Sequence, residues 1–98
     1  DGSLLAFFRR LGQLRAERIS MQCGIIRYLH AQGGGLVIER LHGTERTVTA
    51  LNAGDAPLEL TLTWDGRLCI DAVTGQQFLS QSSTVRLTLP PLDGVILV

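Results

Sequence analysis

The fold is decided by residues 46–62, RTVTALNAGDAPLELTL, where two alternating segments stand on either side of a turn. Apolar and polar residues alternate along 46–50 and 58–62, with the period of two that is typical of half-buried strands. Asn52, Gly54 and Asp55 favour a turn, because Asn and Asp bond nearby backbone groups and glycine accepts positive φ. Pro57 lacks an N–H and fits a strand start or an edge. The stretch predicts a β-hairpin and contains no catalytic pattern.

The composition describes one modest domain with an apolar surplus. Its 98 residues suffice for a single core but not for a cleft between two domains. Nine Arg and no Lys balance nine acidic residues, so we expect no nucleic-acid partner. No apolar run approaches the ~20 residues that span a bilayer, so we expect no membrane. A hydrophobic content of 45% beside 18% charged residues predicts that some apolar surface faces a neighbour.

Residues 3–19 predict the one amphipathic helix. Ser3 is the candidate N-cap, and Arg10 is expected on the polar face with Arg9, Gln13 and Glu17. Each large apolar side chain gains roughly 1.5 to 3 kcal/mol when it is fully buried, so the apolar stripe predicts an interface. Its partner is the rest of the chain, an absent neighbour or a second copy in a homodimer. The stripe consists of Leu4, Phe7, Phe8, Leu11 and Leu14.

From residue 25 the hydrophobic period changes to two. Segments 25–31 and 36–42 flank a glycine-rich connection at 32–35, and further strands are expected at 67–73, 84–89 and 94–98. Turn signals recur about every eight to twelve residues. The sequence therefore predicts a mainly β fold, an antiparallel Greek-key-like β-sandwich of about seven or eight strands preceded by one amphipathic α-helix. The boundary is placed near residue 23, with 1–22 and 23–98 as the two parts.

No catalytic, cofactor or metal site is predicted. Asp65 and Asp71 form the one close acidic pair in the strand region, but Asp at a turn is ordinary. His30 and His42 flank the glycine-rich hairpin and are expected near one another across it. A metal would need third and fourth ligands at a recognised spacing, which the sequence lacks.

The cysteines and the first residues bear on the compartment. Cys23 and Cys69 are interpreted as two small buried hydrophobes, with a disulfide between them left open. Asp1 opens the chain without Met, as in a cut fragment, and no signal-peptide pattern follows. The location stays open, with the cytoplasm slightly favoured.

Three stretches taken in order carry a family resemblance: LLAFFRRLGQLRAER at 4–18, ALNAGDAPLELTL at 50–62 and VRLTLPPLDGVILV at 85–98. Together they resemble the C-terminal end of the α-amylase family of glycoside hydrolases, in particular neopullulanase, cyclomaltodextrinase and maltogenic amylase-like members. The resemblance implies that residues 1–22 are the terminal helix of an absent catalytic barrel and that 23–98 are the C-terminal β-sandwich domain. The family's catalytic carboxylates would lie upstream of residue 1.

The resemblance implies a non-catalytic accessory domain that stabilises the catalytic barrel of an enzyme acting on α-glucans. The fragment itself is then not an enzyme, and its partner is the barrel of the parent chain. An alternative is an α-glucan-binding module that uses Trp64, Asp65 and Arg67, because a tryptophan at a turn offers a flat apolar face beside hydrogen-bonding groups. A lone Trp in a sandwich is also commonly a core residue. An unrelated structural or assembly sandwich is the third possibility.

Overall fold

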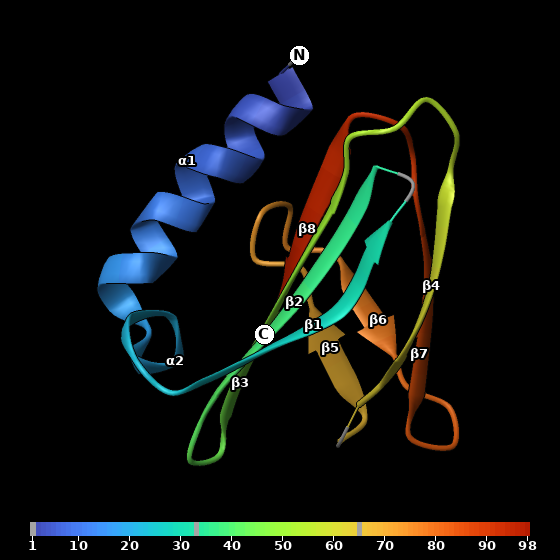
Figure 1. Ribbon diagram of the computed structural model, residues 1–98. Helices are drawn as coiled ribbons and strands as arrows, with labels where there is room; N and C mark the ends of the chain where they lie inside the picture. Colours follow the sequence, from blue (N-terminus) through green and yellow to red (C-terminus); the bar gives the residue numbers. More distant parts are fainter. Residues whose placement is uncertain (1, 33, 65) are drawn as a thin grey trace.

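The computed structural model describes residues 2–32, 34–64 and 66–98 (Figure 1). The side chains of residues 2, 3, 31 and 32 lie outside this description, and so does the predicted Ser3 cap. Two helices precede the strands, α1 (Gly2–Glu17) and α2 (Ile19–Gln22). The eight strands in the described part of the chain are β1 (Ile25–Gln32), β2 (Gly35–His42), β3 (Glu45–Asn52), β4 (Leu58–Thr63), β5 (Leu68–Ile70), β6 (Gln77–Leu79), β7 (Thr84–Leu89) and β8 (Asp93–Leu97).

The strands form an antiparallel sandwich, which confirms the predicted fold class. One layer is a four-stranded sheet in the order β1-β2-β3-β8, and β4 pairs with β7 across from it. β5 and β6 form a short third sheet near the end of β8, where Val98 N donates to Ile70 O at 3.0 Å. The chain leaves the four-stranded sheet after β3 and returns as β8 beside β3. Figure 1 shows the two layers facing each other, with α1 outside the four-stranded sheet.

The predicted hairpin at 46–62 is wrong, although both of its strands exist. β3 pairs with β2 and β8, while β4 pairs only with β7 in the opposite layer. The connection therefore crosses between sheets. Asn52 directs the crossing: its Nδ2 donates to Ala56 O at 2.8 Å and to Leu89 O at 3.1 Å, and its Oδ1 accepts from Gly54 N. The side chain thus ties β3 to the end of β7, which a tight hairpin turn would not do.

The main core fills the space between the two layers. Alternation in β7 is regular, with Val85, Leu87 and Leu89 buried and their neighbours exposed. The inner faces of the other strands supply the remaining side chains in the same way. The core consists of Val37, Val48, Ala50, Leu60, Leu62, Trp64, Cys69, Val85, Leu87, Leu89, Val95 and Leu97.

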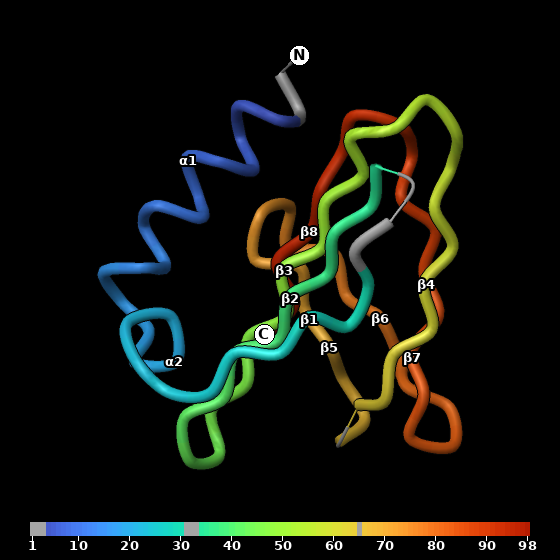
Figure 2. The backbone as a smooth tube through the Cα atoms, viewed as in Figure 1, coloured from blue at the N-terminus to red at the C-terminus, as the bar shows by residue number. Residues whose placement is uncertain are grey.

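A second, smaller core lies between α1 and the outer face of the four-stranded sheet. Phe7 is 1% exposed and packs with Leu14 on Ile96 of β8. Gly94 makes this close approach possible, since a Cβ there would lie 2.6 Å from Phe7 Cδ1. The smoothed trace in Figure 2 follows α1 along this side of the sheet. Partly buried Leu11 and Leu51 complete the contact.

Two local predictions for the helix are corrected. α1 ends at Glu17 because Arg18 is extended, with φ −108° and ψ 128°, and α2 follows as a separate turn. Arg10 lies beside Gln13 and Glu17, as predicted: its Nη1 donates to Gln13 Oε1 at 3.0 Å and lies 3.6 Å from Glu17 Oε2, while its Nε donates to Ala72 O at 3.1 Å. Phe8 is 52% exposed, so the predicted stripe is only partly covered.

The region 67–79 also differs from prediction. The expected strand at 67–73 is reduced to β5, and residues 77–79 form β6, for which no strand was expected. Asp71 explains the early end of β5. Its Oδ1 accepts from Val73 N at 3.0 Å and from Ile96 N at 3.2 Å, and its Oδ2 accepts from Thr74 Oγ1 at 2.9 Å. These bonds hold a turn against β8.

Candidate functional site

The acidic and histidine residues singled out in the sequence do not meet in a reaction centre. Asp65 lies outside the described residues, and Asp71 is 2% exposed and fully engaged in its turn. His30 pairs with Val37 in the middle of β2, whereas His42 pairs with Glu45 at the far end of that strand. The expectation that the two histidines lie near one another is therefore wrong. Among the described residues no three His, Cys, Asp or Glu side chains gather as metal ligands do.

The two cysteines are both free and differ in environment. Cys69 is completely buried in the main core, and burial raises the pKa of its thiol to about 11. Cys23 ends α2 and is exposed, so the prediction that both are buried is wrong for this residue. The structure contains no bond between them.

Trp64 lies in the main core and offers little of its ring to a sugar. It is 6% exposed, and its Nε1 donates to Leu68 O at 3.1 Å. The guanidinium of Arg46 lies over the ring, with Cζ 5.0 Å from the centroid, which is cation–π geometry. Arg67 is exposed. An exposed aromatic plate is absent at this position, and a sugar contact by Trp64, Asp65 and Arg67 stays a prediction.

A network of charges around the buried carboxylate of Glu39 connects the two layers beside Trp64. Glu39 on β2 is 2% exposed and receives Arg27 Nε at 2.7 Å and Arg46 Nε at 2.6 Å. Arg46 Nη1 also donates to Thr63 O on β4 at 2.7 Å. Burial raises the pKa of Glu39, but the hydrogen bonds and charges of the two arginines outweigh burial and hold that pKa below its usual value. The network is therefore ionised and carries one net positive charge at neutral pH.

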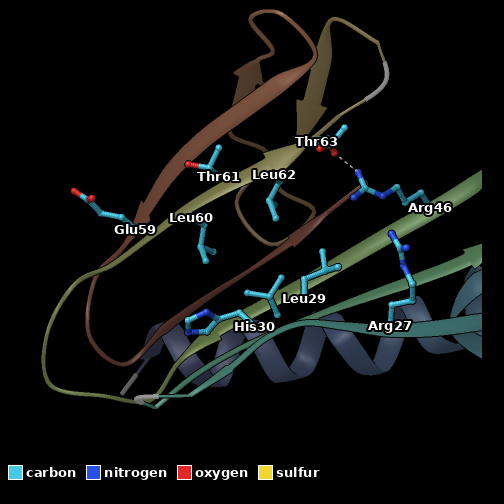
Figure 3. Close-up of a pocket in the computed structure, with 10 residues that line it drawn as sticks. Arg27, Leu29, His30, Arg46, Glu59, Leu60, Thr61, Leu62 and Thr63 are labelled. Atoms are coloured by element: carbon cyan, nitrogen blue, oxygen red, sulfur yellow. Dashed lines mark hydrogen bonds between the residues drawn. The ribbon is translucent and has the colours of Figure 1, made fainter.

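This network forms one end of a cleft at the open side of the sandwich, which we name the edge cleft (Figure 3). Its walls are β1, the edge of the four-stranded sheet, and β4 of the opposite layer. Figure 3 shows Arg27 and Arg46 together at one end, with Leu29, Leu60 and Leu62 between the strands. The cleft has a volume of about 330 Å³ and is lined by Arg27, Leu29, His30, Val37, Arg46, Glu59, Leu60, Thr61, Leu62 and Thr63.

A second polar network fixes the junction of the helices on the outer face of β3. Arg18 Nε donates to Thr47 Oγ1 at 2.7 Å, and Ser20 Oγ lies 2.9 Å from the same hydroxyl. The backbone N–H of Ser20 donates to Glu45 Oε2 at 2.5 Å. The hydrogen bonds from Ser20 hold the pKa of Glu45 below its usual value. This network, together with Phe7 and Leu14, fixes the helices to the sheet.

Large apolar side chains remain exposed on the same side of the sheet as the helices. Leu5 and Phe8 of α1 are 58% and 52% exposed, and Tyr28 of β1 is 69% exposed. The β1–β2 register places Ile26 and Tyr28 opposite Arg40 and Ile38, on the face away from Arg27 and the edge cleft. We call the set Leu5, Phe8, Ile19, Ile26 and Tyr28 the helix-side apolar surface. Contiguous apolar patches on a protein surface commonly mark interaction sites, which makes these residues a candidate interface.

The predicted interface stripe is thus divided in two. Phe7 and Leu14 are buried against β8, and Leu4 and Leu11 are partly buried. Only Phe8 of the five is open to a further partner. Sequence reasoning missed β1 as the second contributor of exposed apolar residues. The signal was present in 25–29, IIRYL, where four of five residues are apolar or aromatic and no strict alternation sets one face apart.

The fold is shared with parts of several carbohydrate-active enzymes, although no family model matches the chain. An Anoxybacillus α-amylase matches over 99% of this chain with a TM-score of 0.82 and 24% identity, and the match covers 22% of that enzyme. The α-amylase of Geobacillus thermoleovorans, crystallised with acarbose, matches over 91% with a TM-score of 0.79 and 20% identity, covering 21% of its chain. A debranching enzyme of Nostoc punctiforme matches over 91% with a TM-score of 0.64 and 25% identity, covering 18% of its chain.

The chain therefore spans about a fifth of the length of the enzymes it matches. In each case nearly all of this chain is superimposed on one part of a larger hydrolase. We conclude that the chain has the fold of a domain that recurs within α-amylases and related glycoside hydrolases.

Proposed function

We propose that this chain is a non-catalytic C-terminal accessory domain of an α-amylase-like glycoside hydrolase that acts on α-glucans. The observation that carries the proposal is the match of 99% of the chain to 22% of an α-amylase, with a TM-score of 0.82. A domain of this size within such an enzyme leaves the catalytic carboxylates to another part of the parent. The neopullulanase and cyclomaltodextrinase-like subtype belongs to the same proposal and rests on the motifs at 4–18, 50–62 and 85–98.

The domain stabilises the parent by covering apolar surface of its catalytic barrel. The helix-side apolar surface is the part of the chain suited to that contact, because α1 is already fixed to the sandwich by Phe7 and by the Arg18–Thr47 bond. Its remaining outward face, with Phe8, lies on the same side of the sheet as Tyr28 of β1. Covering these two side chains is worth about 1 to 2 kcal/mol each, since Phe8 is 52% and Tyr28 69% exposed.

The gene itself gives the first test. We expect the coding sequence upstream of Asp1 to encode a (β/α)₈ barrel with a carboxylate nucleophile and a carboxylic acid about 5 Å apart, as retaining glycosidases require. An unrelated domain at that place contradicts the proposal.

The second test separates docking on a barrel from folding of the domain itself. In the full-length parent, Phe8→Ser combined with Tyr28→Ser should shorten the half-life of α-glucan hydrolysis on heating by about tenfold and leave KM unchanged. In the isolated chain the same pair should change the urea midpoint little, because both side chains are exposed. Leu79→Ser is the matched control, since Leu79 is 75% exposed on β6. Equal effects of the pair and the control would refute docking through this surface.

Two other predicted roles are tested on the isolated chain. A maltoheptaose titration followed by Trp64 fluorescence should show no saturable change if the domain is only a stabilising cover. A saturable change would favour the α-glucan-binding alternative. Light scattering during size-exclusion chromatography reports the predicted homodimer, and loss of a dimer in Phe8→Ser would assign it to the helix.

A further inference from the structure

The two layers approach each other near both ends of the edge cleft. At one end Arg46 joins the two layers through Glu39 and Thr63 O. At the other end the layers come close at Gly35, where an added Cβ would lie 2.7 Å from Leu58 Cδ2. The intervening segment of β4, from Glu59 to Thr63, is about 13 Å long at the usual rise of a strand. A volume of about 330 Å³ falls at the lower end of the range for small-molecule sites.

A β-bulge brings two consecutive residues of β1 to the cleft. The β1–β2 register shifts between Tyr28 and His30, so that Leu29 is the extra residue of the edge strand. Leu29 lies two positions from Arg27 and lines the cleft opposite Leu60 and Leu62 of β4, and the bulge places His30 at the cleft as well (Figure 3). Leu29 is 40% exposed, while Leu60 and Leu62 are 7% and 6% exposed. A ligand would therefore contact an apolar floor and one adjustable apolar wall.

Arg27 supplies a cationic group with donors to spare. Its Nε and Nη2 both lie 2.7 Å from Glu39 Oε1, yet its side chain is 61% exposed. A guanidinium has five N–H donors, and among the described residues the structure gives Arg27 Nη1 no acceptor. Because Glu39 is shared with Arg46, the pair of arginines is not neutralised. This end of the cleft is therefore complementary to one negative charge.

We propose that the edge cleft binds a small amphipathic carboxylate, with its carboxylate on Arg27 and its apolar body against Leu29, Leu60 and Leu62. Phe, Tyr and Trp are absent from the residues that line the cleft, so a sugar ring would find none of the large aromatic side chains on which sugars commonly stack. An arginine with a planar set of donors suits a carboxylate, and the leucines suit an unbranched alkyl chain. This site is separate from the helix-side apolar surface, since Arg27 and Tyr28 point to opposite faces of β1.

The test titrates the 98-residue chain with octanoate, octanol and acetate. Methyl NMR shifts of Leu60 and Leu62 report the apolar contact, and fluorescence of Trp64 reports movement of the overlying Arg46. For a ligand of about ten heavy atoms we expect octanoate to bind with a Kd of about 1 mM or below. Octanol lacks the charge and acetate lacks the chain, so each should bind at least about tenfold more weakly.

Variants assign the two halves of the site. Arg27→Gln should raise the Kd of octanoate about tenfold. Arg40→Gln should leave the Kd unchanged, because Arg40 lies on β2 and on the face of the sheet away from the cleft. Leu29→Asp places an anion on the wall and should abolish binding. This variant still tests the site if Arg27→Gln fails to fold. Leu29 is partly exposed in the bulge, so we expect its substitution to leave the fold intact. Equal binding of octanoate and octanol, an unchanged Kd in Leu29→Asp, or no saturable shift would overturn the proposal.

Discussion

The contact between Phe7 and Gly94 provides a sharp test of how the helix is fixed to the sandwich. Phe7 is 1% exposed, and its ring occupies the space in which a side chain at Gly94 would lie. Phe7→Ala should cost about 3 to 5 kcal/mol of unfolding free energy, the usual range for a buried phenylalanine. Phe8→Ala is the matched control one position later. Because Phe8 is 52% exposed, it should cost less than about 1 kcal/mol.

Substitution of the glycine tests the same contact from the other side. A Cβ at position 94 would lie 2.6 Å from Phe7 Cδ1 and 2.7 Å from Cε1, so the ring must move. Gly94→Ala should therefore cost about 1 to 3 kcal/mol by overpacking. In the Phe7→Ala background the space is empty, and the same change should be neutral or stabilise by about 0.5 kcal/mol, since glycine is unfavourable in a strand. The expected coupling energy is thus about 1 to 3 kcal/mol.

Urea denaturation is the assay, with Trp64 fluorescence for the sandwich and circular dichroism at the helix band for α1. Both probes should report one transition in the unsubstituted 98-residue chain. Additive costs of Phe7→Ala and Gly94→Ala would refute the packing argument, and so would equal losses in Phe7→Ala and Phe8→Ala. If the Phe7→Ala chain loses its helix signal at a lower urea concentration than the sandwich signal, then the contact holds α1 in place but contributes little to the stability of the sandwich.

Three further outcomes are expected. Folding lowers the pKa of Glu39 and Glu45, so the two carboxylates contribute fully to the free energy of unfolding above about pH 4.5. This contribution is lost as the pH falls through the pKa values of the folded state. The urea midpoint should therefore drop in acid, and it should drop less steeply in Glu39→Gln than in the unsubstituted chain. A thiol reagent should modify one thiol per native chain, at Cys23, and two after denaturation, because Cys69 is buried with a pKa of about 11; two fast thiols in the native chain would contradict this burial. Asn52→Ala should lower the free energy of unfolding by about 2 to 3 kcal/mol in the same urea assay, because the change leaves buried carbonyls such as Leu89 O without their donor. A loss below about 0.5 kcal/mol would show that the crossing between the sheets does not depend on Asn52.

The alternation of apolar residues predicted most strands but could not assign their partners. In 46–62 the alternation correctly marks β3 and β4, and it says which side chains face inward. It carries no information on the long-range pairing of β3 with β8, and Asn52 has bonding partners 37 positions away that a local turn rule ignores. β6 was missed because three residues with one half-buried side chain give no readable period.

The helix shows the same division between local pattern and tertiary context. Helical spacing groups Phe7 with Phe8, but only the position of Gly94 decides which ring is covered. The edge cleft could not be predicted either. Arg27 and Arg46 are 19 positions apart, and a sequence gives no sign that Glu39 lies between them or that a bulge brings both Leu29 and His30 to the cleft.

The Phe7 contact also sets an order of events during synthesis. Gly94 and Ile96 are made 87 and 89 residues after Phe7. Until they emerge from the ribosome, α1 has no finished strand on which to bury Phe7, and its apolar face stays open to chaperones or to other nascent chains. Truncation from the C-terminal side by five residues should therefore release the helix at the opposite end of the sequence.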